Sequence, residues 1–149
     1  MGTKLLSSNA YYVTSQSELE TIPTDVEEMG IQTFATSNLT TVNITELQSL
    51  RTLVLGRFSL RGVSNFELNG LENLETLVIL KQSFMDGNGR FGIMNCPKLK
   101  SIQIKEYSFR NYQSFELDNL PSLQSIEIGQ YCFNDTVSFS LNGYSDELE

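Results

Sequence analysis

The sequence predicts a mainly β fold, a solenoid of about five to six coils of 24 residues with two short parallel strands in each coil. Three observations indicate this fold class. Residues 95–109 recur 24 positions later as residues 119–133, with eight of the fifteen positions identical. An apolar anchor residue returns at regular intervals along most of the chain. Apolar and polar residues alternate twice within each interval, which is typical of half-buried strands.

The anchor residue opens each repeat unit, at successive spacings of 24, 24, 25 and 24 residues. The five anchors are Val26, Leu50, Leu74, Leu99 and Leu123. An apolar pair three and five residues after the anchor, such as Ile126 and Ile128, predicts the first strand of each coil. A second apolar pair, such as Phe139 and Leu141, predicts the second strand. Because one coil cannot bury its apolar face alone, stacking of the coils must supply the core.

Other positions of the unit predict how each coil turns. Leucines three residues apart at the start of the unit predict a tight turn or a short helical turn that enters the first strand. A small residue followed by a larger one, as in Ser108 and Phe109, predicts a corner where a neighbouring coil comes close and a ring fills the core. Four of the five units end in Asn or Gly, which predicts bends with positive φ. These residues are Gly70, Asn95, Asn119 and Gly143.

The one unit of 25 residues carries its extra residue in residues 85–90, a Gly-rich stretch with turn chemistry. Its DGNG sequence, residues 86–89, resembles the start of a calcium loop. The later ligand positions of such a loop hold Arg90 and Pro97, which cannot serve as oxygen ligands from their side chains. We therefore expect a plain turn there.

The whole chain, residues 1–149, is expected to form a single repeat domain. Residues 23–143 hold five repeats, and residues 144–149 form an acidic C-terminal tail or cap. Residues 1–22 are predicted to be a degraded N-terminal unit or cap. In that unit Ala10 and Tyr11 are expected to stand where Ser83 and Phe84 stand in a full unit.

The pattern resembles the leucine-rich repeat. Residues 47–55 read LxxLxxLxL, and residues 71–79 read LxxLxxLxI. Residues 123–133 read LxxIxIGxxxF, which is similar to a divergent subclass found in surface antigens of bacteria and protists. The resemblance covers about residues 23–143 and implies a right-handed solenoid that binds proteins or other ligands. The second half of the unit departs from many leucine-rich repeats, because an FxLxN strand stands where they carry a helix.

Composition argues against several classes of partner and activity. Eighteen acidic residues against ten basic ones give a net charge of −8, which disfavours nucleic acids and anionic membrane surfaces as partners. No apolar run approaches the roughly 20 residues of a membrane span, and the first residues do not read as a signal peptide. Histidine is absent, which removes the commonest general base and metal ligand. We expect no catalytic residue, metal or cofactor, and a cytoplasmic location and a cell-surface or secreted one both stay open.

The two cysteines are expected to be structural. Cys132 occupies the small-residue position of the repeat, and Cys96 occupies a leucine position. Because they lie at different phases of the repeat, a disulfide between them is not expected. No basic neighbour is indicated that would lower a thiol pKa, so both are predicted to be buried free thiols.

The outward face of the first strands is the surface on which we expect a partner to bind. The residues predicted for this face are Thr52, Val54, Thr76, Val78, Leu80, Ser101, Gln103, Ser125 and Glu127. Val54, Val78 and Leu80 are expected to form a small exposed apolar patch, of a kind that can mark an interaction site. Another interpretation is that these residues only pair across strands, as β-branched side chains do without any partner.

Three functional hypotheses follow from these observations. The chain is expected to be a non-enzymatic scaffold that binds a protein or other macromolecule through its strand faces. The alternative is a structural or self-associating segment of a larger repeat protein, acting through open ends of the solenoid. An enzyme that uses paired carboxylates on a β-solenoid is the third hypothesis and has the least support.

Overall fold

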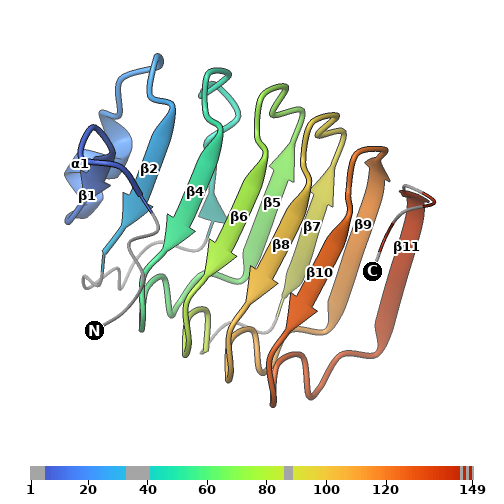
Figure 1. Cartoon of the computed structure of the whole chain (residues 1–149). Coiled ribbons are helices and arrows are strands. Elements are labelled where there is room, and N and C mark those ends of the chain that lie inside the picture. Colours follow the sequence, from blue (N-terminus) through green and yellow to red (C-terminus); the bar gives the residue numbers. More distant parts are fainter. Residues whose placement is uncertain (1–5, 33–40, 86–88, 145, 147, 149) are drawn as a thin grey trace.

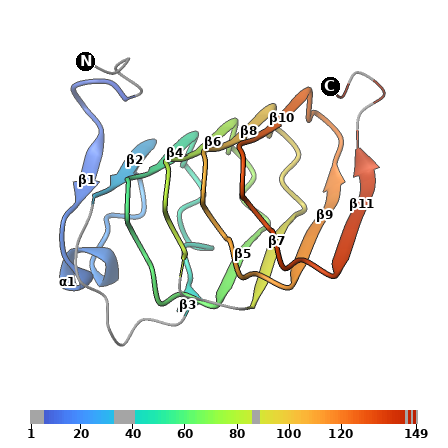
Figure 2. The same ribbon diagram turned by 90° about the horizontal axis from the view of Figure 1, so that it is seen from below.

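The structure, a computed structural model, describes residues 6–32, 41–85, 89–144, 146 and 148. Two parallel β-sheets face each other across one core, and the coils stack along a single direction (Figures 1 and 2). Sheet A contains, in spatial order, β1 (Tyr11–Val13), β2 (Glu28–Ile31), β4 (Thr52–Leu55), β6 (Thr76–Ile79), β8 (Ser101–Ile104) and β10 (Ser125–Ile128). Sheet B contains β11 (Ser138–Tyr144), β9 (Ser114–Leu120), β7 (Arg90–Met94), β5 (Asn65–Asn69) and β3 (Thr41–Val42). One helix, α1 (Gln16–Glu20), lies between β1 and β2 in the chain.

The strand register confirms the repeat. In sheet A, Glu28 pairs with Thr52, Thr52 with Thr76, Thr76 with Ser101, and Ser101 with Ser125, which are steps of 24, 24, 25 and 24 residues. The chain is therefore a mainly β solenoid of about four turns of about 24 residues, with two parallel sheets and almost no helix. Four regular steps join the five strands from β2 to β10, which gives about four turns in place of the five to six coils expected. The N-terminal unit adds no regular turn, because it does not follow the repeat.

The position of the extra residue also agrees with the prediction. Thr52 to Thr76 is a step of 24 in sheet A, whereas Asn65 to Arg90 is already a step of 25 in sheet B. The insertion therefore falls between Thr76 and Arg90, the interval that contains the Gly-rich stretch. Residues 86–88, which hold most of the DGNG sequence, lie outside the described residues.

The leucine anchors form the turns that enter sheet A. Leu50, Leu74, Leu99 and Leu123 are fully buried. In each of these turns the anchor N–H donates to the carbonyl oxygen three residues earlier; from Leu50 to Leu47 the N···O distance is 3.1 Å. This bonding is that of a single tight turn, as the leucine spacing predicts.

The small residues at the corner after each sheet A strand have a second role beyond size. Ser59, Ser83 and Ser108 are fully buried. The Ser83 hydroxyl donates to the Gly56 carbonyl one coil away at 2.8 Å, and the Ser108 hydroxyl bonds the Leu80 carbonyl in the same way at 3.0 Å. A buried carbonyl without a partner would be costly, so these side chains stabilise the corner as well as admit the neighbouring coil.

Phenylalanine rings fill the core in two stacked rows that touch edge to face. The first row is Phe66, Phe91, Phe115 and Phe139, with successive ring-centroid distances of 5.4, 4.9 and 4.4 Å. The second row is Phe84, Phe109 and Phe133, at 4.4 and 5.2 Å. The rows meet where Phe91 lies edge-on to Phe109 at 4.8 Å. These geometries are favourable for aromatic pairs, and they confirm that the aromatic after the small residue fills the core.

Bends with positive φ occur at all four residues for which the sequence predicts them. The φ angles are +76° at Gly70, +54° at Asn95, +54° at Asn119 and +61° at Gly143. The Asn119 side-chain amide also donates to the Asn95 side-chain oxygen at 2.8 Å, so the asparagines bond from coil to coil. Glycine and asparagine are the residues that adopt this conformation most readily.

The register predicted for the N-terminal unit is wrong. Tyr11 pairs with Met29, and Val13 pairs with Ile31, so this stretch is the first strand of the unit rather than the corner after it. Helix α1 follows where a full coil would continue to a sheet B strand. Its start is stabilised by Ser15, whose hydroxyl accepts the Glu18 N–H at 3.3 Å, in a Ser-x-x-Glu pattern typical of helix N-termini. This local signal overrides the 24-residue period.

Candidate interaction face

The outward side chains of sheet A, which we call the outer face, align in two rows across the strands. The first row is Thr52, Thr76, Ser101 and Ser125, and the second is Val54, Val78, Gln103 and Glu127. Each residue pairs in register with the next. The sequence therefore places these eight residues correctly on one face, because a period of two within a strand and a period of 24 between strands determine both coordinates.

The first row carries only hydroxyl groups and crosses four strands. Thr52, Thr76 and Ser101 are half-buried, and Ser125 is exposed. Such a row offers short donors and acceptors at the strand spacing of roughly 4.8 Å. It can hydrogen-bond a polar surface laid across the sheet, and on β2 the same row continues to the carboxylate of Glu28, which pairs in register with Thr52.

The apolar patch expected in the second row is not exposed. Only 7% of Val54 and 4% of Val78 is accessible to solvent, and both pack with Leu6 in a small cluster separate from the main core. Leu80 and Ala10 are half-buried at its edge. The N-terminal segment thus crosses the outer face and covers the two valines, which the strand pattern could not predict because it concerns a residue outside the repeat.

Two contacts explain how Leu6 reaches the valines. Gly30 occupies the second row beside Val54, and a Cβ at Gly30 would lie 2.9 Å from Leu6 Cδ1. The missing side chain therefore provides the space for Leu6. The adjacent Ser7 donates its backbone N–H to the Glu28 carboxylate at 3.3 Å, and its hydroxyl bonds the same carboxylate. A glycine in a row of valines was the only sequence signal for this contact.

Ion pairs link neighbouring coils along the margins of the outer face. Arg51 Nη2 lies 3.5 Å from Glu75 Oε1, and Lys105 Nζ lies 3.9 Å from Glu127 Oε1. Glu127 keeps 65% of its side chain exposed. Exposed ion pairs of this kind contribute about 0–1 kcal/mol each to the free energy of unfolding. They therefore affect the electrostatic potential of the outer face more than the stability of the fold.

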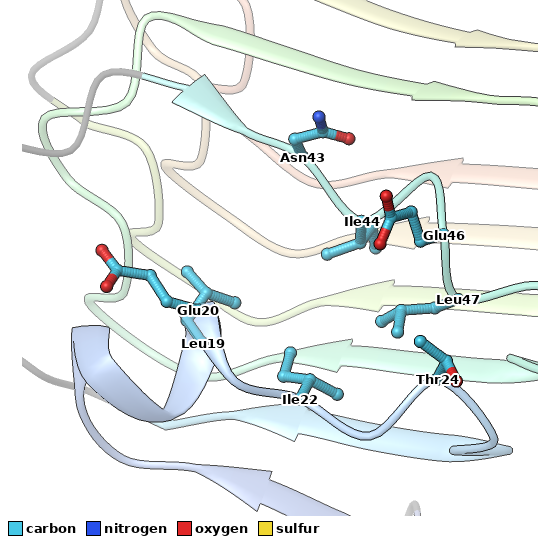
Figure 3. Close-up of a pocket in the computed structure, with 8 residues that line it drawn as sticks. All are labelled: Leu19, Glu20, Ile22, Thr24, Asn43, Ile44, Glu46 and Leu47. Atoms are coloured by element: carbon cyan, nitrogen blue, oxygen red, sulfur yellow. The ribbon is translucent and has the colours of Figure 1, made fainter.

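A shallow hollow of about 250 Å³ lies between α1 and the turn after β3 (Figure 3). Its apolar lining is Leu19, Ile22, Ile44 and Leu47, and its polar lining is Thr24, Asn43, Glu20 and Glu46. The described residues that line it include two carboxylates but no Lys, Arg or Cys. The residues that line this hollow include two acids, Glu20 and Glu46, but no recognisable set of catalytic groups.

Both cysteines are free thiols, as predicted. Cys96 is fully buried, whereas Cys132 is only half-buried because it lies in the last coil. Burial raises the pKa of each thiol above its ordinary value. Their sulfurs donate to backbone carbonyls of Met94 and Lys105, at 3.3 and 3.1 Å. These thiols are therefore protonated at neutral pH and poorly nucleophilic.

Within the described part of the chain, no three Cys, Asp or Glu side chains come together in a way that could hold a metal ion. In the same residues, no helix has the length and apolar character needed to cross a membrane.

The fold defines the chain as a β-solenoid of coils of about 24 residues with two parallel sheets. No protein-family model matches the sequence, and no curated protein or solved structure is significantly similar to it.

Proposed function

We propose that the chain is a divergent leucine-rich-repeat protein whose coils wind to the right. The LxxLxxLxL phrases of residues 47–55 and 71–79 support this proposal, since their leucines form the turn and the inward side of a sheet A strand. Right-handed winding is the strong preference of parallel strands joined by crossovers. The partial N-terminal unit and the five following repeats would then be variants of one ancestral coil.

We further propose that the protein is a non-enzymatic scaffold that binds a protein or other macromolecule through the outer face of sheet A. The observation that supports this function is the alignment of the two outward rows over four strands. The half-buried Thr76 and Gln103 lie at the centre of this surface, beyond the part that Leu6 covers. An ordered polar surface on a rigid sheet suits a partner that makes many hydrogen bonds.

Paired variants of the two sheets test the binding face. Thr76→Arg with Gln103→Arg places two bulky cations on the outer face of sheet A. Asn65→Arg with Ser114→Arg places two on the outward side of sheet B, at half-buried positions of the same kind. We expect proteins that the native chain captures from an extract of its source organism to be captured by the sheet B variant and lost from the sheet A variant. Equal capture by both variants would contradict the proposal.

A second candidate function is self-association of the solenoid, as a structural segment of a larger repeat protein. The observation that favours it is the exposure of core residues at the last coil, where 61% of Phe139 is accessible. Light scattering of the purified chain over a hundredfold range of concentration tests it. A mass that rises with concentration supports self-association, and a constant monomer mass removes it.

A further inference from the structure

The segment that covers part of the outer face is attached to it by few contacts. We call residues 6–10 the strap. Leu6 is 5% exposed because it packs on Val54 and Val78, whereas the three residues that follow it are exposed. Among the described residues, both hydrogen bonds from the strap to sheet A end on the carboxylate of Glu28. The strap is therefore held on the sheet mainly by one leucine and one carboxylate.

A hollow of about 430 Å³ lies between the strap and the turn that enters β2. Its lining includes Ser7, Asn9 and Ala10 of the strap and Val26 and Glu27 of the turn. The strap also bonds to itself, because the Ala10 N–H donates to the Ser7 carbonyl at 3.2 Å and the Asn9 N–H donates to the Ser7 hydroxyl at 3.3 Å. The strap can therefore leave the sheet without breaking a strand ladder.

Sheet A forms a seat for one side chain of the size of leucine. We call the seat the four residues Tyr12, Gly30, Val54 and Val78. A Cβ at Gly30 would lie 2.9 Å from Leu6 Cδ1 and 3.1 Å from the ring of Tyr12, so the glycine provides the space that Leu6 fills. The two valines pack on the same leucine. Departure of Leu6 would therefore leave an apolar site within the second row.

The burial of one leucine favours the closed strap by a modest factor. Full burial of a leucine side chain corresponds to roughly 10- to 150-fold in an equilibrium constant. A small domain of ordinary stability is folded by a factor of about 10³ to 10⁸. The strap should therefore open far more often than the solenoid unfolds, as expected for a segment with few buried apolar contacts.

We propose that the strap is an autoinhibitory contact, which opens while the solenoid stays folded and then uncovers the seat for an aliphatic side chain of a partner protein. The partner segment that fits places a leucine in the seat and a hydrogen-bond donor at Glu28, as Leu6 and Ser7 do in this chain. The inference rests on the proposed function of the outer face. It adds an apolar contact to a surface whose accessible residues are otherwise polar.

Thiol labelling of the full chain measures the opening of the strap. Val78→Cys, made together with Cys132→Ser, places a thiol under Leu6, and the buried Cys96 of the same molecule reports unfolding of the solenoid. We expect the introduced thiol to be labelled faster than Cys96, and about tenfold or more faster again when Leu6→Asp is added. Labelling of both thiols at one common rate would overturn the proposal, because the strap would then open only with the solenoid. Leu6→Ala replaces Leu6→Asp if circular dichroism shows that the latter is unfolded.

A synthetic peptide with the sequence of residues 3–10 tests whether the seat accepts a leucine from another chain. A short tethered segment has an effective concentration on the order of 1 mM, so the closing factor above gives a Kd of roughly 10–100 µM for the full-length Leu6→Asp variant. The native chain should bind the peptide at least about tenfold more weakly, because its own strap occupies the seat. Anisotropy of a fluorescent label on the peptide measures both values, and a peptide with Leu6 replaced by Asp should not bind.

A further substitution locates the site on the sheet. Gly30→Val, added to Leu6→Asp, should weaken peptide binding about tenfold, because the new side chain fills the seat. Gln103→Val is the matched control, since it adds a valine to the same row on β8, and binding should stay within about twofold. No saturable binding, or equal binding to the native chain, to Leu6→Asp and to the Gly30→Val variant, would overturn the proposal. Equal capture by the sheet A and sheet B variants described above would contradict the outer-face function and leave the labelling and peptide results unchanged, so the two failures are distinguishable.

Discussion

Replacement of Phe109 by Ala tests the aromatic core most severely. Phe109 is fully buried and stacks on Phe84 at 4.4 Å and on Phe133 at 5.2 Å. It also lies edge-on to Phe91 and Tyr112, each at 4.8 Å. Removing a buried phenylalanine ring costs about 3–5 kcal/mol, which includes the cavity left between the coils. Because domains are stable by only about 5–15 kcal/mol, this loss is a large part of the total.

The comparison variant is Phe139→Ala, which removes a ring of the other stacked row in the last coil. With 61% of Phe139 exposed and water able to fill the space, we expect a loss of about 1 kcal/mol. Urea unfolding followed by far-ultraviolet circular dichroism gives both values, and the dependence on urea concentration should not change. Equal losses of unfolding free energy for Phe109→Ala and Phe139→Ala would contradict the burial of Phe109, since the two rings would then be equally covered.

Three further predictions concern backbone conformation and buried groups. Asn119→Ala should cost about 1–2 kcal/mol in urea unfolding, because Asn119 has φ of +54°, whereas Asn119→Gly should cost less; the reverse order would contradict the bend. Burial raises the pKa of Tyr112 and of Cys96, so the folded chain keeps protons that the unfolded chain releases, and stability should fall as pH rises above about 9. Tyr112→Phe should reduce this fall, measured as the urea midpoint at pH 7 and pH 10.5, and an unchanged fall would exclude the tyrosine as its source. A thiol reagent at pH 7 should label Cys132 slowly and Cys96 only after unfolding, and prompt labelling of both would show that the core is open.

The repeat made most of the solenoid predictable. Leu99 and Leu123, the buried Ser108 and the bend at Asn119 all lie where the 24-residue period and the chemistry of the residue types indicate. Two-residue alternation then determined which side chains point outward. Stacking against an identical neighbour gives every internal coil the same environment, so one consensus describes them all.

Features outside the repeat were not predictable in the same way. Tyr11–Val13 forms a strand rather than a corner because the Ser15 cap begins a helix directly after it, and a single irregular unit has no period to align. The contact of Leu6 with Val78 depends on the path of the N-terminal segment through space. The positive φ of Phe109, +54°, also went unpredicted, because a bulky residue disfavours that conformation. The same conformation recurs at this corner position in Leu60, Phe84 and Phe133, and the Phe109 N–H donates to the Ser83 carbonyl one coil away at 3.1 Å.

For the candidate binding face, too, the sequence predicts one part and misses another. The alignment of Thr76 with Ser101 and of Val78 with Gln103 follows from sequence alone. The burial of Val78 does not follow from sequence alone. Because Val54 and Val78 are covered, Gln103 and Glu127 are the accessible residues of the second row. The accessible part of the second row therefore lies on β8 and β10 rather than at the valines.

Nuclear Overhauser contacts between residues one coil apart test the central claim, that each repeat contributes one strand to each of two parallel sheets. We expect backbone contacts between Leu53 and Leu77 in sheet A and between Phe91 and Phe115 in sheet B. Extended-strand chemical shifts should accompany them over residues 114–120. Helical shifts and contacts between residues three apart over 114–120, with no contact between Phe91 and Phe115, would contradict it.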